Sequence, residues 1–400
     1  MSAEDDAFRS EVRAWLATHA AGFRAPVERS NEDLVAASLA WQRLKAEAGY
    51  AAVDEPPEMG GRNGTRAMAM ICAQEEGRYF TPMYTGLGIG RGMALPTIKK
   101  HGTPEQYVRF AKPTLWGEKG WCQLFSEPSA GSDLAGLRTK AVRDGDNWVI
   151  NGQKVWSSWA HHADYAILLA RTDPSVVKHA GITFFVLDMK SPGVEVRPIR
   201  QISGKSDFNE TFLTDVVIPD ANRIGAEGEG WACAMTVLAH ERNGASGSLR
   251  SADAGVRGMI VKAAATPRGG GVALDSAAVR AKLAQWWVEE QGLRNFGQRV
   301  TAALARGETP PVAMMKLVSA SKLQMTNAFL MDVDEYDGLF SGPDQPERDG
   351  IFYQYVWSSA MRIAGGADEI LRNQLAERAL GMPAEPRMDK VPFNELPGVK

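Results

Sequence analysis

Apolar residues recur at helical spacing near both ends of the chain, and they form short strand-like runs in the middle. A spacing of three and four residues predicts helices that bury one face. Two such sets lie near the amino terminus: Phe8, Val12, Trp15 and Leu16, followed by Leu34, Ala37, Leu39, Trp41 and Leu44. Between helices, the proline and glycine residues of 55–61 and the glycines of 85–92 predict loops.

The middle of the chain changes to short runs rich in β-branched and aromatic residues, at 148–150, 166–169 and 182–187. Pairs typical of turns separate them: Asp144-Gly145, Asn151-Gly152 and Pro192-Gly193. Helical patterns return at 231–238, 275–304, 314–331 and 369–380. We therefore expect an α+β protein with an N-terminal helical domain (1–118), a middle β-barrel-like domain (119–225) and a C-terminal helical bundle (226–400).

Composition narrows the classes of function. The chain has 400 residues, more than one core usually holds, and its net charge of -3 gives no sign of a nucleic-acid binder. Cys72, Cys122 and Cys233 are scattered, so a disulfide framework or zinc site is not expected. The acidic, amphipathic start lacks the features of a secretory signal, and no apolar run could span a bilayer. We expect a cytoplasmic protein without a membrane partner.

Residues 125–133, FSEPSAGSD, form the first candidate for chemistry. Small residues and a glycine let backbone N–H groups approach an anion, and the Ser132 hydroxyl can add a bond. A polar β-turn without a ligand explains the same residues equally well.

Residues 149–158, VINGQKVWSS, form the second candidate. A strand, a tight turn and a second strand would deliver Trp156 and Ser158 to one face, because side chains alternate along a strand. An aromatic plane beside a hydroxyl suits a flat heteroaromatic ligand. The alternative is that Trp156 fills the core of the β domain.

Taken together, the two stretches resemble the acyl-CoA dehydrogenase family, and the order of helices, strands and helices agrees. The matching residues also include His161, Ala163, Asp164 and 170–173. The resemblance implies FAD as cofactor, with Phe125 and Ser126 bonding the flavin ring. It places Gly131 and Ser132 near the FAD phosphates and the CoA part of the substrate, and it places Trp156, Ser157 and Ser158 at the isoalloxazine.

The reaction of this family needs a carboxylate that removes a proton next to the thioester carbonyl. Some members carry this Glu late in the chain, where Gly365 stands here. Another branch carries it on the first long helix of the C-terminal domain, which points to Glu241. Arg242 would then help to hold the CoA or the local fold. The alternative for both residues is a solvated pair on a helix face.

Two stretches depart from the homotetrameric members, which complete the FAD site across a subunit interface. An Arg-x-x-Phe-Gly-like motif is absent from 263–271, and Arg294 to Gly297 has similar letters but lies too far downstream. An acidic stretch at 333–340 replaces a Gln-x-x-Gly-Gly-like string and would repel phosphates. This pattern resembles a bacterial branch, including steroid side-chain enzymes, that pairs two different chains as α2β2.

The expected function is therefore FAD-dependent α,β-dehydrogenation of an acyl-CoA, in fatty acid or steroid catabolism, with electrons passing to an electron-transfer flavoprotein. The partner is a second acyl-CoA dehydrogenase-like subunit or another copy in a homo-oligomer such as a tetramer. Two other readings stay open: an acyl-CoA oxidase on the same fold, and a structural partner subunit without chemistry of its own. His161 and His162 have no third metal ligand at the usual spacing, so we expect no metal site.

Overall fold

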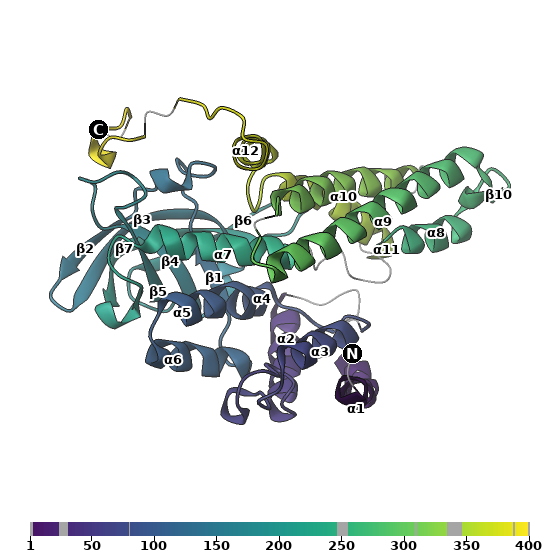
Figure 1. Ribbon diagram of the computed structural model, residues 1–400, viewed down its shortest axis with the longest axis horizontal. Coiled ribbons are helices and arrows are strands. Elements are labelled where there is room, and N and C mark those ends of the chain that lie inside the picture. Colours follow the sequence, from purple (N-terminus) through teal and green to yellow (C-terminus); the bar gives the residue numbers. More distant parts are fainter. Residues whose placement is uncertain are drawn as a thin grey trace. The chain divides into compact units, whose positions relative to one another are not determined.

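The computed structural model describes residues 3–23, 31–79, 81–245, 255–308, 310–333, 346–386 and 389–398 (Figure 1). Contacts divide the chain into two compact units. The first consists of Met1–Glu241 with Pro386–Lys400, and the second of Arg242–Glu385.

The first helices of this unit bury the residues that the apolar spacing predicts. Helix α1 buries Phe8, Val12 and Leu16, which recur every four residues, and Trp41 of α2 joins the same core. Side chains cap later helices: the Thr65 hydroxyl accepts a bond from the Met68 amide at the start of α3. The helices before the sheet are α1 (Ala3–His19), α2 (Asn31–Glu47), α3 (Arg66–Glu76), α4 (Thr85–Ile89), α5 (Leu95–His101) and α6 (Pro104–Leu115).

The prediction of a glycine-rich loop over 85–92 is wrong. This stretch forms α4 and then a π-helical turn, Gly90–Ala94, which runs into α5. Two of the glycines allow close packing of this segment, because a Cβ at Gly86 would lie 2.4 Å from the Tyr84 hydroxyl and one at Gly90 2.4 Å from the Trp121 ring. Packing against aromatic side chains therefore overrides the low helix propensity of glycine.

An eight-stranded sheet follows, with the strand order β6-β7-β3-β2-β4-β5-β8 and β1 paired to β4. The pairings are antiparallel except for β1 with β4 and β2 with β4. Buried and less buried residues alternate at the start of β3, which explains its mixture of apolar and polar residues. Nearly all residues of β4 are buried, which explains its continuous apolar run. The strands are β1 (Trp121–Leu124), β2 (Lys140–Asp144), β3 (Asn147–Ser158), β4 (Tyr165–Arg171), β5 (Ile182–Asp188), β6 (Val194–Ile199), β7 (Phe208–Pro219) and β8 (Arg223–Ile224).

The turn predicted at Asn151-Gly152 is also wrong, because β3 continues through both residues and stays paired to β7. A register shift between Ile150 and Gly152 marks an irregularity instead of a reversal. A Cβ at Gly152 would lie 2.4 Å from the Thr139 hydroxyl. The glycine therefore allows a close approach inside the sheet, which is a known use of glycine in strands.

Helix α7 (Gly230–Ala245) follows the sheet and crosses in front of it in Figure 1. Its residues Cys233, Ala234 and Val237 belong to the same buried cluster as Phe125 of the sheet domain. The end of the chain returns to this unit, where the Phe393 amide donates to the Val176 carbonyl and the Arg171 guanidinium lies 3.5 Å from the Phe393 ring centroid.

The second unit is helical, as predicted, and its core includes Met259, Leu283 and Trp286. A small hairpin, β9 (Pro267–Arg268) with β10 (Gly271–Val272), was not expected; Gly269 and Gly270 turn it with positive φ angles. The helices are α8 (Val256–Ala265), α9 (Ala277–Ala305), α10 (Ala313–Val333), α11 (Pro346–Ser358) and α12 (Asp368–Gln374).

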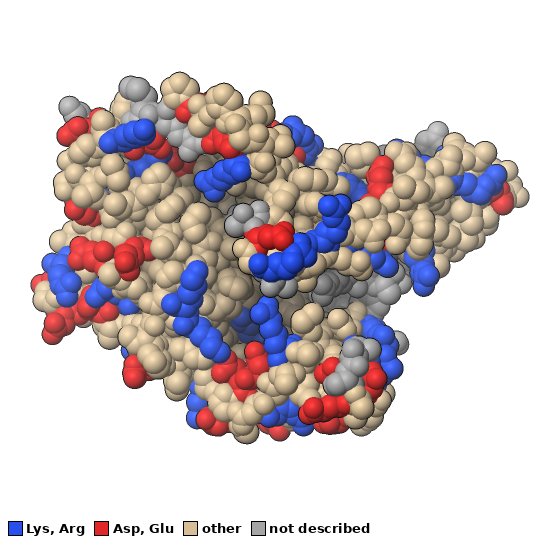
Figure 2. Space-filling model, in the orientation of Figure 1, with Lys and Arg blue, Asp and Glu red and all other residues tan. Residues whose placement is uncertain are grey.

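The predicted fold class of helices, sheet and helices is confirmed, whereas its exact domain boundaries stay a prediction. In the part of the chain that the structure describes, no helix combines the length and the apolar character needed to cross a bilayer. On the face drawn in Figure 2, Lys and Arg side chains are interspersed with Asp and Glu.

Candidate functional site

The first predicted motif forms a short loop after β1 whose carbonyl groups turn into the protein. The Phe125 carbonyl accepts a bond from the Lys154 ammonium at 3.0 Å, and the Ser126 carbonyl accepts one from the Val155 amide at 2.9 Å. Glu127 and Ala130 close the loop with two backbone bonds of 3.0 Å. Neither the amide nor the hydroxyl of Ser126 bonds to any residue that the structure describes. Two donors on Ser126 are therefore available to a ligand.

Gly131 and Ser132 follow this loop at the surface, and both are exposed. Their amides and the Ser132 hydroxyl likewise make no bond within the described parts of the chain. A Cβ built at Gly131 would meet no atom within 4 Å, so the backbone is open to an approaching group. Unpaired amides in open space suit an anion. The Asp133 carboxylate, in contrast, forms an ion pair with the Lys178 ammonium at 2.8 Å.

The second motif ends in a β-bulge that reverses the side-chain alternation of β3. Lys154 pairs with Thr211 and Ser157 with Asn209, so two residues of β3 oppose one of β7 between these pairs. Trp156 adopts a positive φ of 61° and is 60% exposed. The alternative that it fills the core is wrong. Ser157 is buried, whereas Ser158 is partly exposed, so Trp156 and Ser158 do lie on the less buried side of the strand.

The Ser157 hydroxyl is buried and has no partner among the residues that the structure describes. A buried hydroxyl without a bond is costly, so it marks a place where a ligand or water belongs. The Ser157 carbonyl accepts a bond from the side-chain nitrogen of Asn209 at 2.8 Å, and the side-chain oxygen of Asn209 lies 2.9 Å from Nδ1 of His161. His161 is therefore engaged in holding the strand. Among the described residues, no group of three His, Cys, Asp or Glu side chains could hold a metal ion.

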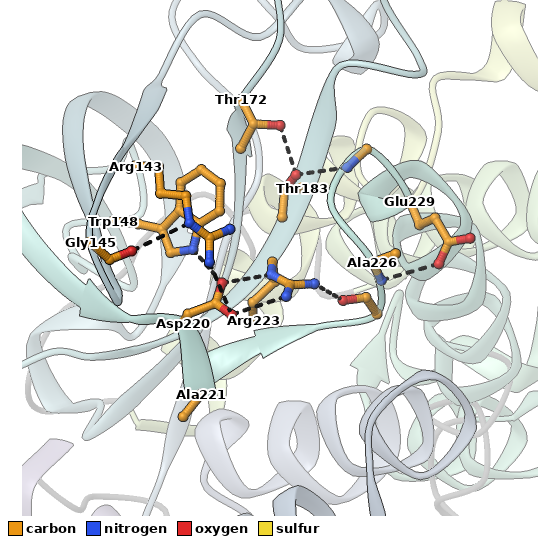
Figure 3. A network of polar contacts seen from close by, with 12 residues as sticks. Arg143, Gly145, Trp148, Thr172, Thr183, Asp220, Ala221, Arg223, Ala226 and Glu229 are labelled. Carbon is orange, nitrogen blue, oxygen red and sulfur yellow. Dashed lines mark hydrogen bonds and ion pairs between the residues drawn. The ribbon is translucent and has the colours of Figure 1, made fainter.

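A polar network, which the sequence did not predict, joins the end of the sheet to the start of α7 (Figure 3). Asp220 accepts bonds from the Trp148 indole at 2.7 Å and from Nε of Arg223 at 2.8 Å. Arg223 also donates to the Gly225 carbonyl at 2.5 Å. The bonds from Arg223 and Trp148 outweigh burial and lower the pKa of Asp220 to about 2.

A second part of the same network fixes the turn into α7. The buried Thr183 hydroxyl on β5 accepts the Gly228 amide at 3.0 Å and lies 2.8 Å from the Thr172 hydroxyl (Figure 3). At Gly230, a Cβ would lie 2.6 Å from the carbonyl carbon of Thr183. The first residue of α7 therefore touches the backbone of β5, which leaves little freedom in where the helix begins.

Glu241, the predicted base, lies on α7 and is partly exposed. Val237, one turn earlier, is buried in the cluster that contains Phe125. Residues four apart lie on one helix face, so Glu241 lies on the same face of α7 as Val237. The side chain of Arg242 lies outside the described side chains. Gly365 has a φ of 66°, a conformation that favours glycine over a residue with a carboxylate side chain.

The stretches that lack the interface motifs lie in the second unit. Residues 263–271 form the end of α8 and the β9–β10 hairpin, and Arg294 to Gly297 lie inside α9. Of the acidic stretch 333–340, residues 334–340 lie outside the described residues.

Models of three domains match the chain in order. They describe the acyl-CoA dehydrogenase N-terminal domain (residues 2–118), middle domain (residues 122–216) and C-terminal domain (residues 228–380). The chain belongs to the acyl-CoA dehydrogenase family. This membership confirms the predicted family, fold and cofactor class, because acyl-CoA dehydrogenases are FAD-dependent oxidoreductases.

Among the relatives, acyl-CoA dehydrogenase IpdE1 of Mycobacterium tuberculosis is 34% identical over 94% of this chain and 98% of its own length. Acyl-CoA dehydrogenase FadE34 of the same organism is 41% identical over 72% of this chain, but this match spans only 39% of FadE34. Among solved structures, the Tcur3481-Tcur3483 steroid ACAD is 25% identical with a TM-score of 0.79, covering 96% of this chain and 99% of that chain. The ChsE4-ChsE5 complex from Mycobacterium tuberculosis is 28% identical with a TM-score of 0.77, over 96% and 99%.

The residues present fit a flavin of this family. Ser126 offers an amide and a hydroxyl, and the buried Ser157 hydroxyl lacks a partner among described residues. Trp156, which precedes Ser157 on the bulge, exposes its ring. The bond from Val155 to Ser126 brings the two sequence motifs into direct contact. Sequence reasoning missed the residues that tie these motifs together, Lys154 and Glu127.

Proposed function

We propose that this acyl-CoA dehydrogenase introduces a double bond between the α and β carbons of an acyl-CoA thioester. The observation that carries the proposal is the Ser126 loop, whose carbonyls are turned inward while its amide and hydroxyl remain available. Phe125, Ser126, Trp156, Ser157 and Ser158 would hold the flavin ring. FAD, when bound, supplies the acceptor for the hydride that leaves the β carbon.

In this proposal, Gly131 and Ser132 bind the phosphates of FAD and the CoA portion of the substrate. The exposed, unbonded amides of these two residues support this role, because backbone N–H groups bind anions without adding bulk. Arg242 would add a positive charge toward the CoA.

Glu241 removes the α proton in this proposal. A carboxylate that a bound acyl chain shields from water has a raised pKa, which suits a general base near neutral pH. The position of Glu241 on the same face of α7 as Val237, which belongs to the buried cluster of Phe125, supports this role. The left-handed backbone at Gly365 supports it too, since the competing position in the chain is built for glycine.

The assembly we propose is a heteromer in which a second acyl-CoA dehydrogenase-like subunit completes the FAD site. The departures at 263–271 and 333–340 support it, and so do two matching structures, the Tcur3481-Tcur3483 steroid ACAD and the ChsE4-ChsE5 complex. A homo-oligomer is the alternative. The likeness to a steroid ACAD also favours a bulky, sterol-like acyl group. We further propose a cytoplasmic location and transfer of electrons to an electron-transfer flavoprotein.

The experiment is anaerobic mixing of the flavin-loaded protein with acyl-CoA thioesters of straight, branched and ring-bearing acyl groups. The proposal expects at least one of them to bleach the flavin absorbance and to yield the 2-enoyl-CoA. If none of these thioesters reduces the flavin of a protein fully loaded with FAD, the proposed dehydrogenase activity is refuted. Oxygen consumption during turnover would identify an acyl-CoA oxidase instead.

The FAD content per chain distinguishes the assemblies. Near-stoichiometric FAD in the protein purified by itself would establish a homomer and contradict the heteromer. Little FAD alone, restored by co-expression with a second family member, would establish the heteromer.

A further inference from the structure

A buried ion pair lies beneath the Ser126 loop and takes no part in the chemistry proposed above. The Lys154 ammonium lies 2.8 Å from Oε1 of Glu127, and the two side chains are 0% and 5% exposed. Burying two charges costs about as much free energy as their attraction returns, so apolar residues would stabilise this position equally well. The presence of the pair therefore calls for an explanation other than stability.

The pair and one backbone bond hold three consecutive residues of the loop. The Lys154 ammonium bonds the Phe125 carbonyl as well as Glu127. The Glu127 carboxylate in turn accepts the amide of Arg138 at 2.6 Å and that of Thr139 at 2.9 Å. With the bond from the Val155 amide to the Ser126 carbonyl, each residue from 125 to 127 is tied to β3 or to the chain entering β2.

These bonds decide which groups of the loop face outward. The Phe125 and Ser126 carbonyls both accept bonds from β3, so the peptide groups on either side of Ser126 have fixed orientations. What remains unbonded to any described residue is the amide and hydroxyl of Ser126. Lys154 also directly precedes the bulge at Val155 and Trp156, so one side chain links the loop to the strand that carries the exposed ring.

Burial lowers the pKa of Lys154, and the charge and hydrogen bond of Glu127 oppose that shift. Burial raises the pKa of Glu127, but the charge of Lys154 and the bonds from Lys154, Thr139 and Arg138 hold it below its usual range. A charged acceptor bonds backbone amides more strongly than a neutral one.

We propose that Lys154 and Glu127 are positioning residues for the cofactor, which hold residues 125–127 and the adjoining bulge so that the Ser126 donors face the flavin. This inference rests on the proposed function, because it assigns the pair its role in binding the same flavin. The pair itself does not touch the reacting atoms.

Three variants test it, in whichever form of the protein, alone or co-expressed, binds FAD. Lys154→Met removes the bonds and leaves a buried carboxylate. The double variant Lys154→Met with Glu127→Gln removes the charge of both members of the pair, and the carboxamide oxygen that replaces the carboxylate can still accept one backbone amide. Ile150→Ala is the matched control, since Ile150 is buried on the same strand and packs in a cluster that contains no residue of the loop. The measurements are the melting temperature of the apoprotein, the Kd for FAD, and the spectrum and midpoint potential of the bound flavin.

We expect Lys154→Met to melt lower and to bind FAD at least about tenfold more weakly, the effect of losing one charged hydrogen bond. The double variant should recover most of the melting temperature, because neither member of the pair is left charged without the other, yet keep the weakened Kd and a shifted flavin spectrum and potential. Ile150→Ala should melt lower while its Kd stays within about twofold of wild type, because the buried cluster that contains it includes none of residues 125–133.

Wild-type affinity and flavin potential in the double variant would overturn the inference and leave the proposed function standing. An Ile150→Ala variant that weakens FAD binding as much as the double variant would overturn it as well, because general destabilisation would then explain the effect. If the wild-type protein binds no FAD, either alone or co-expressed, the proposed function itself fails, and the role of the pair fails with it.

Discussion

Replacing Asp220 by Asn tests whether the polar network of Figure 3 stabilises the junction between the sheet and α7. Asn keeps an oxygen for the Trp148 indole but loses the charge that pairs with Arg223. The folded protein lowers the pKa of Asp220 from 3.8 to about 2. Such a shift corresponds to about 2.5 kcal/mol in favour of the folded state at neutral pH. The Asp220 side chain is 27% exposed, so solvent screening reduces the expected loss to about 1–1.5 kcal/mol.

The sign of the pH dependence follows from the lowered pKa. The unfolded chain binds a proton at Asp220 near pH 4, whereas the folded chain does so only near pH 2, so the stabilisation is complete above pH 4 and disappears between these values. Thermal melts of wild type and Asp220→Asn should differ by a few degrees at pH 7, and the difference should shrink below pH 4. Asp144→Asn is the control, because Asp144 is an exposed carboxylate on β2 of the same sheet. An equal loss in Asp144→Asn, or a difference that is unchanged at pH 3, would refute the reasoning.

Three further predictions concern the same unit. Gly230→Ala should lower the melting temperature and slow flavin reduction by acyl-CoA, because its Cβ would collide with backbone of β5, whereas Gly88→Ala, in open space, should leave both unchanged or raise stability. Thr183→Val should cost about 1–3 kcal/mol in denaturant unfolding by leaving the Gly228 amide without its acceptor, and Thr172→Val, which retains that bond, should cost less. Cys72, Cys122 and Cys233 should resist a thiol reagent at pH 8 in the native protein, because burial raises the pKa of Cys72 to about 11 and of Cys233 to about 12 and also raises that of Cys122. All three should react in denaturant, and reaction of any one in the native state would contradict its burial.

Periodicity predicted most of the elements because burial and sequence agree in them. Phe8, Val12 and Leu16 bury one face of α1, and the continuous apolar stretch of β4 is buried on both sides. The prediction failed where a contact distant in sequence decides the local structure. Gly90 is helical because it packs against Trp121.

The candidate site was likewise predictable in part: its motifs were, and the contacts between them were not. Two motifs could be recognised from their letters, and the structure joins them through the bond from Val155 to Ser126. The exposure of Trp156 could not be predicted. The bulge before Ser157 shifts the alternation of buried and exposed side chains by one residue, and no residue type in the sequence indicates it. The role of Lys154 was also hidden, since a lysine in a strand is usually on the surface.

The central claim is that Glu241 is the base of an acyl-CoA dehydrogenase, and Glu241→Gln tests it most directly. The measurement is the rate of anaerobic flavin reduction by an acyl-CoA substrate in a protein shown to hold FAD as well as wild type does. Glu227→Gln, an exposed glutamate before the same helix, is the control. We predict that Glu241→Gln binds FAD and substrate but reduces flavin at least about a hundredfold more slowly, the contribution of a general base, while Glu227→Gln matches wild type. Reduction at the wild-type rate in Glu241→Gln would contradict the account and assign the chemistry to another residue or another subunit.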